Sequence, residues 1–352
     1  MTSLRTLSAR RLLIGATAVL LAITTACGGA PPASPAGADT LPISVLVNTG
    51  YVPGLPLIVA KERGLFAQNG LDATLVSDIR GDTAQLSALV SGSVDLEGQS
   101  VATAAKTFQT GTRLPLVASY VAGVPYVLVV SSRLAGSVPA ATPGPEGWQA
   151  TVRALKGVTI AASGGGGAFD SYLKALFSDA GLAETDFSNI NIALQPGAQL
   201  AAFQSGQVDA SMADPATAAS LEAAGGRTVL DMARQGPDWL TGQAWSGFMM
   251  SQDTIDENPE LAKRVQAVIA DTKAFFRDPA NLPELHRIAV QVSGVPESPA
   301  LDGVLTGLTQ LMVDDFGDDQ MAVTLEFLTR TGQLKPEPTV TARDILSPSL
   351  AG

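Results

Sequence analysis

The chain contains one short pattern twice, once in each half. Ser91 to Leu96 reads SGSVDL, and Ser205 to Ala210 reads SGQVDA. Before each copy the apolar residues have helical spacing, and the residues around each aspartate suit a short strand, so both copies predict a helix, a glycine turn and a strand. Two copies of one such unit predict a chain with two similar lobes.

Each copy follows a strand, a loop and a helix. In the first half residues 41–48 predict a strand, and residues 55–64 predict a helix with Pro56 in its first turn, where the missing N–H is tolerated. In the second half residues 158–161 predict a strand, and residues 169–180 predict a helix after a glycine loop. Strands that alternate with helices predict an α/β fold, in which ligands bind beyond the carboxyl ends of the parallel strands.

The composition removes several classes of function. The 352 residues are 46% hydrophobic, which is ample for a buried core, and the net charge of −11 argues against nucleic-acid binding. Cys27 and His286 are the only cysteine and histidine, so they cannot supply the roughly four ligands of a structural zinc site. His286 lies in a stretch of helical spacing and is expected to be a surface or packing residue. We therefore expect no catalytic residue, no metal and no cofactor.

The N-terminal residues predict an export signal and a tether. Arg5, Arg10 and Arg11 precede an apolar run at 12–23. This run is shorter than the stretch of about 20 residues that spans a membrane, so residues 1–26 are expected to be a signal peptide. Residues 27–39 are rich in Gly, Pro, Ala and Ser and predict a disordered tether.

The stretch from Ala60 to Val76, AKERGLFAQNGLDATLV, predicts a helix end, a turn at Gly64, a second turn at Asn69-Gly70 and a strand. It resembles the signature A-x-E-x-G-(L/F)-F-x-x-x-G-L-D-V-x-L of ABC-importer solute-binding proteins for nitrate, taurine, alkanesulfonates or thiamine precursors, the NMT1-like group. This resemblance implies a two-lobed, periplasmic-binding-protein-like fold of type II. Each lobe is then a mixed, mainly parallel sheet with flanking helices.

The segment TTACGG around Cys27 resembles the lipobox of bacterial lipoproteins, with Thr24 where leucine is usual. This resemblance implies lipid attachment at Cys27 and a place on the extracytoplasmic face of the cell membrane. An ordinary signal peptide with an unused thiol is the alternative. The family further implies a monomer that binds a small-molecule ligand and works with an ABC permease and its ATPase.

The resemblance also implies where the chain passes between lobes. Residues 40–129 and 248–352 are expected to form lobe 1, and residues 130–247 are expected to form lobe 2. Residues from Leu334 onward are expected to be a terminal tail.

Candidate ligand contacts lie in the loops that follow predicted strands, and in one aromatic residue before the second crossing. The helix that opens at Gln99-Ser100 and the glycine loop present backbone N–H groups that suit an anion. An acidic side chain in the cleft suits an amine or hydroxyl group. The candidates are Tyr51, Gln99, Ser100, Ser163, Gly164, Gly165, Gly166, Asp214 and Trp245.

Each candidate has an alternative structural role. Tyr51 and Trp245 also suit core packing, Ser100 and Asp214 suit helix caps, and the glycine loop suits a plain turn. These alternatives remain open at the level of the sequence.

A ligand loop on each lobe predicts hinge closure around a crevice lined by main-chain amides. A ligand-sensing lipoprotein of the same fold is one alternative to transport. The pyrimidine synthase of thiamine biosynthesis, which shares the fold, is another, but that enzyme depends on histidine and a cysteine cluster, and this chain has one of each. The sequence leaves the identity of the ligand open.

Overall fold

The computed structural model describes residues 40–49, 52–77, 79, 81–144, 146–162, 168–192 and 196–348. The chain divides into two units, 1–35 and 36–352, and the fold below is that of the second unit. The predicted signal peptide, the tether and Cys27 lie outside the described residues. Within the described part, no helix has both the length and the apolar character needed to cross a membrane.

The first lobe is built on five strands. β1 (Leu41–Leu46) pairs in parallel with β2 (Leu71–Val76), and a parallel bridge from Val45 to Leu96 joins β1 to the start of β3 (Glu97–Ser100). β10 (Ala244–Met249) lies between β3 and β4 (Leu116–Ala122) and is antiparallel to both. The resulting order is β2-β1-β3-β10-β4. Among these five strands, β10 alone points in the opposite direction to the others.

The second lobe repeats this arrangement. Its strands are β7 (Ser188–Asn191), β6 (Thr159–Ala162), β8 (Ala210–Ala213), β5 (Val127–Val130) and β9 (Arg227–Asp231), in that order across the sheet. β6 is parallel to β7 and β8, whereas β5 is antiparallel to β8 and β9. Both lobes therefore have a mixed sheet of the same order, which confirms the predicted two-lobed α/β class.

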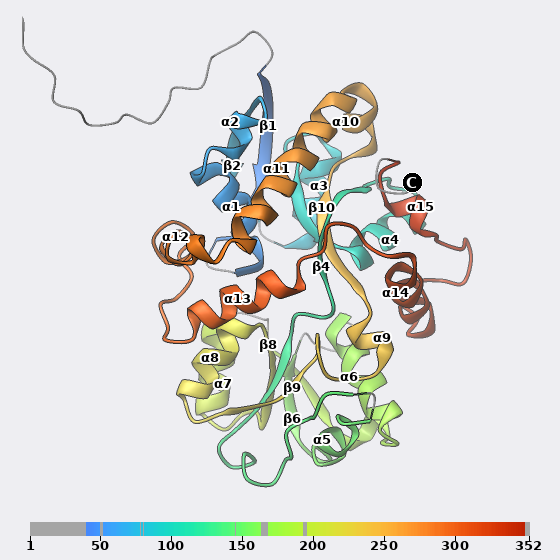
Figure 1. Cartoon of the computed structure of the whole chain (residues 1–352). Coiled ribbons are helices and arrows are strands. Elements are labelled where there is room, and N and C mark those ends of the chain that lie inside the picture. Colours follow the sequence, from blue (N-terminus) through green and yellow to red (C-terminus); the bar gives the residue numbers. More distant parts are fainter. Residues whose placement is uncertain are drawn as a thin grey trace, which may run out of the picture. The chain divides into compact units, whose positions relative to one another are not determined.

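Two segments carry the chain between the lobes (Figure 1). The chain leaves the first lobe between β4 and β5, and returns between β9 and β10. β5 and β10 are the two antiparallel strands, and each is inserted into the sheet that the chain has just entered. The predicted boundaries at 129/130 and 247/248 fall inside β5 and β10, and the residue-level division into lobes stays a prediction.

The duplicated sequence pattern forms the same local structure in both lobes. Gly92 and Gly206 end their helices at φ of 71° and 73°, a left-handed conformation that glycine adopts without steric cost. The carboxylate of Asp95 accepts a hydrogen bond from Ser44 N at 2.7 Å, and that of Asp209 accepts one from Thr159 N at 2.9 Å. In each lobe the aspartate thus ties the repeated turn to the first strand of the sheet.

The helices cover both lobes. Those of the first lobe are α1 (Leu55–Glu62), α2 (Leu65–Gln68), α3 (Asp82–Val90), α4 (Val101–Gln109), α10 (Gln252–Glu257), α11 (Pro259–Arg277), α12 (Leu282–Arg287), α13 (Leu301–Leu311), α14 (Asp318–Arg330) and α15 (Ala342–Ile345). Those of the second are α5 (Gln149–Arg153), α6 (Ala168–Asp179), α7 (Pro196–Gln204), α8 (Pro215–Ala223) and α9 (Asp238–Thr241). Short 3-10 or π turns lie at Val52–Gly54, Pro279–Asn281, Ile288–Val292 and Glu184–Asp186.

The stretch 60–76 folds as its turn residues predict. Gly64 and Gly70 have φ of 68° and 70°, so each allows the chain to reverse where a side chain would be strained. Between them Phe66 is 1% exposed and packs in the core with α1 and α11. The turns therefore place β2 beside β1.

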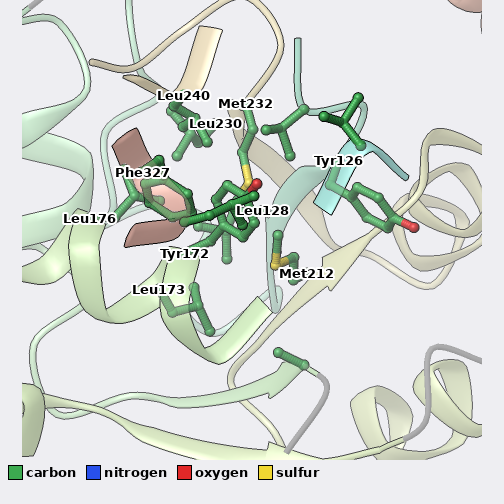
Figure 2. Packing of buried hydrophobic residues seen from close by; sticks show 14 of the residues in the cluster. Tyr126, Leu128, Tyr172, Leu173, Leu176, Met212, Leu230, Met232, Leu240 and Phe327 are labelled. Atoms are coloured by element: carbon green, nitrogen blue, oxygen red, sulfur yellow. The ribbon is translucent and has the colours of Figure 1, made fainter. Parts of the chain in front are cut away.

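The two lobes share part of their hydrophobic core. One cluster contains residues of the second sheet together with residues of α4, α14 and α15. Figure 2 shows Phe327 of α14 beside Tyr172 and Leu176 of α6 within this cluster. α14 is therefore packed against the second lobe although it follows the first lobe's helices in sequence.

The prediction that the residues from Leu334 onward form a terminal tail is wrong. Leu334 and Ile345 are 3% and 1% exposed, and Ser347 N donates to Leu116 O at 2.8 Å, next to β4. The buried residues of this segment are separated by proline and polar residues, so they show neither helical nor strand spacing. They become core residues because α15 packs against α4.

Candidate ligand-binding cavity

A cavity of about 480 Å³ lies between the carboxyl ends of the first lobe's strands and α6 of the second lobe. Its volume is within the range of about 300–1,000 Å³ that is usual for small-molecule sites. The first lobe contributes polar and apolar residues to it, and the second lobe and β10 contribute further aromatic residues. Among the polar residues are Asn48, Gln85, Gln99, Ser100 and Thr103.

Four aromatic side chains form one wall, which we call the aromatic wall: Tyr126, Phe169, Tyr172 and Trp245. The ring centroid of Trp245 lies 5.9 Å from Tyr126, 6.3 Å from Phe169 and 5.8 Å from Tyr172. Tyr126 and Phe169 are 4.5 Å apart. These separations are those of interacting aromatic pairs, so the wall is packed as a unit.

A polar part of the lining begins at the N-terminus of α4. Ser100 Oγ accepts a hydrogen bond from Thr103 N at 3.0 Å and caps the helix. Gln99 Nε2 donates to the carboxylate of Glu97 at 2.6 Å, which holds its amide beside the cavity. A helix N-terminus carries a partial positive charge and suits an anionic or hydrogen-bond-accepting group.

Lys106 is the one charged side chain among the described residues that line the cavity. It lies on α4, and its ammonium donates to Gln333 Oε1 at 2.9 Å. The described lining therefore combines a single cation with several carboxamides, which can both donate and accept hydrogen bonds.

Tyr120 of β4 also lines the cavity. Its side chain is 4% exposed, and its hydroxyl has no hydrogen-bond partner among the described residues. Burial raises the pKa of Tyr120 well above its usual value, so the hydroxyl keeps its proton and remains a donor.

The aromatic wall continues into a contact between the lobes. Tyr172 stacks on Phe327 of α14 at 4.6 Å, and Phe327 stacks on Trp239 of α9 at 4.7 Å. Tyr172 also donates to Gln243 Oε1 at 2.5 Å, just before β10. One side of the cavity is therefore fixed by packing between α6, α9 and α14.

The sequence matches the model of the NMT1-like family over residues 40–290. The chain belongs to the NMT1-like family. This match covers the predicted lobe 2, the predicted lobe 1 as far as residue 290, and the segment from Ala60 to Val76 that resembles the importer signature. In a search of curated proteins, none matched the sequence.

Solved structures share the fold of this NMT1-like chain at low sequence identity. The periplasmic aliphatic sulphonate binding protein SsuA from Escherichia coli is 18% identical, with a TM-score of 0.67 over 88% of this chain and 98% of that one. The periplasmic nitrate-binding protein NrtA from Synechocystis PCC 6803 is 16% identical, with a TM-score of 0.61 over 85% and 84%.

A third solved structure names the fold itself. The CA3427 gene product of Candida albicans exhibits the generic periplasmic binding protein fold; it is 13% identical, with a TM-score of 0.61 over 84% of this chain and 91% of that one. The NMT1-like chain therefore has the periplasmic binding protein fold.

The predicted site residues have different positions in this NMT1-like chain. Gln99, Ser100 and Trp245 line the cavity. Asp214 does not line it, because its carboxylate caps α8 by accepting from Ala216 N at 3.0 Å and Thr217 N at 3.2 Å. Tyr51 and the glycine loop, Ser163, Gly164, Gly165 and Gly166, lie outside the described residues. Ligand contact at all of these positions stays a prediction.

The sequence prediction missed most of the aromatic wall. Phe169 and Tyr172 lie one turn apart on α6, but Tyr126 lies on a distant segment, and it meets them only when α6 packs beside the crossing strand. One signal was available, since Phe169 begins the helix predicted after the glycine loop. In the described part of the chain, no group of three or more His, Cys, Asp or Glu residues is placed to hold a metal ion.

Proposed function

We propose that this protein is the extracytoplasmic solute-binding component of an ABC importer, anchored to the cell membrane through a lipid on Cys27. The observation that carries the proposal is the cavity, whose lining combines polar residues of the first lobe with the aromatic wall. The fold supports it, because known proteins with this fold bind small solutes, as the SsuA and NrtA structures do by their names.

Capture of the solute follows from how the walls are attached. Gln99 and Ser100 belong to the first lobe, whereas Phe169 and Tyr172 belong to the second. A solute in the cavity contacts both sets at once only when the lobes are close together. It therefore shifts the population of lobe arrangements toward closure by its difference in affinity for the closed and open forms.

Delivery is the second part of the proposal. A permease with its ATPase recognises the closed form and releases the solute for import, and the protein acts as a monomer. It binds its solute without converting it, so we propose a binding protein and not an enzyme. The predicted tether 27–39 lets the lobes turn freely while the lipid keeps them near the permease.

Solute capture is tested with protein purified from its host. We expect mass spectrometry of the heat-released fraction to find a small solute, and calorimetry to show that this solute binds the emptied protein. Ser100→Ala should weaken binding, whereas the exposed Asp72→Asn on β2 should not. Absence of any released or binding solute contradicts the proposal.

Anchoring is tested separately with Cys27→Ser. We expect wild-type protein to incorporate a labelled fatty acid and to sediment with membranes, and the variant to do neither. A wild-type protein that is secreted without a fatty acid contradicts the lipid anchor and leaves solute capture intact.

A further inference from the structure

We propose that the solute carries a flat ring, aromatic or otherwise unsaturated, and one acidic or strongly hydrogen-bond-accepting group. This inference rests on the proposed function, because it names the class of solute that the described cavity takes.

The aromatic wall provides the argument for a ring. Trp245 and Phe169 are partly exposed and line the cavity, with their ring planes 35° apart. Tyr126 and Tyr172, which are 7% and 3% exposed, pack against both of these rings. Supported aromatic rings stack well with a flat solute, whereas a small inorganic anion or a saturated chain gains no stacking from them.

The polar part of the lining around α4 provides the argument for an accepting group. Here the N-terminus of α4, the ammonium of Lys106 and the hydroxyls of Ser100 and Thr103 lie on one helix. No acidic side chain is among the described residues that line the cavity. This part of the lining therefore favours a negative or strongly accepting atom near Lys106 and the N-terminus of α4, whereas the buried carboxylate of Glu97 is engaged by the amide of Gln99.

Tyr120 provides an independent observation. Tyr120 lines the same cavity, and its buried hydroxyl has no hydrogen-bond partner among the described residues. Such a group is rare because burying a donor without a partner is unfavourable. An accepting atom of the solute, directly or through one water, satisfies this hydroxyl.

The test uses three probes that separate the contribution of the flat ring to binding from that of the charge: benzenesulfonate, cyclohexanesulfonate and benzenesulfonamide. The first two share a charge but differ in flatness, and the third keeps the flat ring without the charge. Binding to the full chain, emptied of solute, is measured by calorimetry. We expect benzenesulfonate to bind about three- to tenfold more tightly than cyclohexanesulfonate. Equal binding of these two, or binding of neither, overturns the inference.

Two variants assign the effect to named side chains. Trp245→Ala should remove the preference for the flat ring, whereas Trp239→Phe, which changes a tryptophan outside the cavity lining, should keep it. Lys106→Met should weaken the binding of benzenesulfonate and leave the binding of benzenesulfonamide unchanged. If Trp245→Ala keeps the preference for the flat ring, the inference of a ring is overturned. If Lys106→Met weakens the binding of both flat probes equally, the inference of an acidic or accepting group is overturned.

Failure of this inference is distinguishable from failure of the proposed function. A protein that releases and rebinds a saturated aliphatic solute still captures solutes, but does not have the ring specificity proposed here. A protein from which no solute is released and to which none binds has neither.

Discussion

At the scale of single residues, two aspartates have the same role in the two lobes. Asp95 and Asp209 each accept a hydrogen bond from the first strand of their sheet, and each N–H donates back to that strand at 2.8 Å. The sequence pattern predicted a turn and a strand at both positions. It did not predict the carboxylate bond, because the partner strand is distant in sequence.

Replacing either aspartate is expected to destabilise its lobe. Asp95→Ala or Asp209→Ala removes the acceptor of a strand N–H, and we expect a loss of about 1–3 kcal/mol in the free energy of unfolding. Urea denaturation measures this loss, with Asp72→Ala on the exposed face of β2 as the control. A loss no larger than that of the control at both positions contradicts the shared role.

His286 predicts a dependence of stability on pH. Its ring lies between Asp302 at 2.6 Å and Glu297 at 3.0 Å, and hydrogen bonds to these carboxylates raise the pKa of His286 above its usual value. The folded state therefore holds this proton more tightly than the unfolded chain, whose histidine pKa is about 6.5. The stabilisation is complete below the unfolded pKa and is lost as pH rises through the folded pKa.

The measurement compares melting temperatures of wild type and His286→Gln from acidic to mildly alkaline pH. We expect the wild type to be more stable by a margin that shrinks as pH rises. A margin that stays constant or grows with pH contradicts the assigned pKa direction.

At the scale of helices and strands, the sequence predicted local features such as turns better than it predicted which elements pack together. Gly64 and Gly70 were sufficient to place the turns before and after α2, because each acts within its own segment. The position of α14 was not predictable from its spacing. Its apolar residues face the second lobe, and only the folded chain shows that partner.

The stack of α14 on the second lobe predicts a large effect of one substitution. Phe327 is 1% exposed and stacks on both Tyr172 and Trp239. We expect Phe327→Ala to cost about 3–5 kcal/mol of unfolding free energy, as for other buried aromatic residues. Urea denaturation followed by tryptophan fluorescence measures this, with the partly buried Leu325→Ala on the same helix as the comparison. A loss of less than about 1 kcal/mol for Phe327→Ala contradicts the importance of the stack.

At the scale of the whole molecule, the sequence predicted the repeat but not the unequal contacts between the lobes. The stack of Tyr172, Phe327 and Trp239 is buried, at one side of the molecule. Elsewhere Arg234, which follows β9, reaches Gln310 of α13 at 3.0 Å and Gly307 O at 3.3 Å. The second contact is a small exposed one, and such contacts contribute little to stability. We therefore expect the lobes to move more freely at the Arg234 contact than at the aromatic stack.

Closure of the lobes on a solute is the central claim, and energy transfer between fluorophores on the two lobes tests it most directly. The labels are attached to cysteines introduced at two exposed positions, Asp72→Cys in the first lobe and Ala140→Cys in the second, in a chain that also carries Cys27→Ser. We expect transfer to change with solute concentration and to saturate together with the calorimetric binding curve. Saturated binding with no change in transfer, from these labels and from a second pair placed on α10 and α5, contradicts closure.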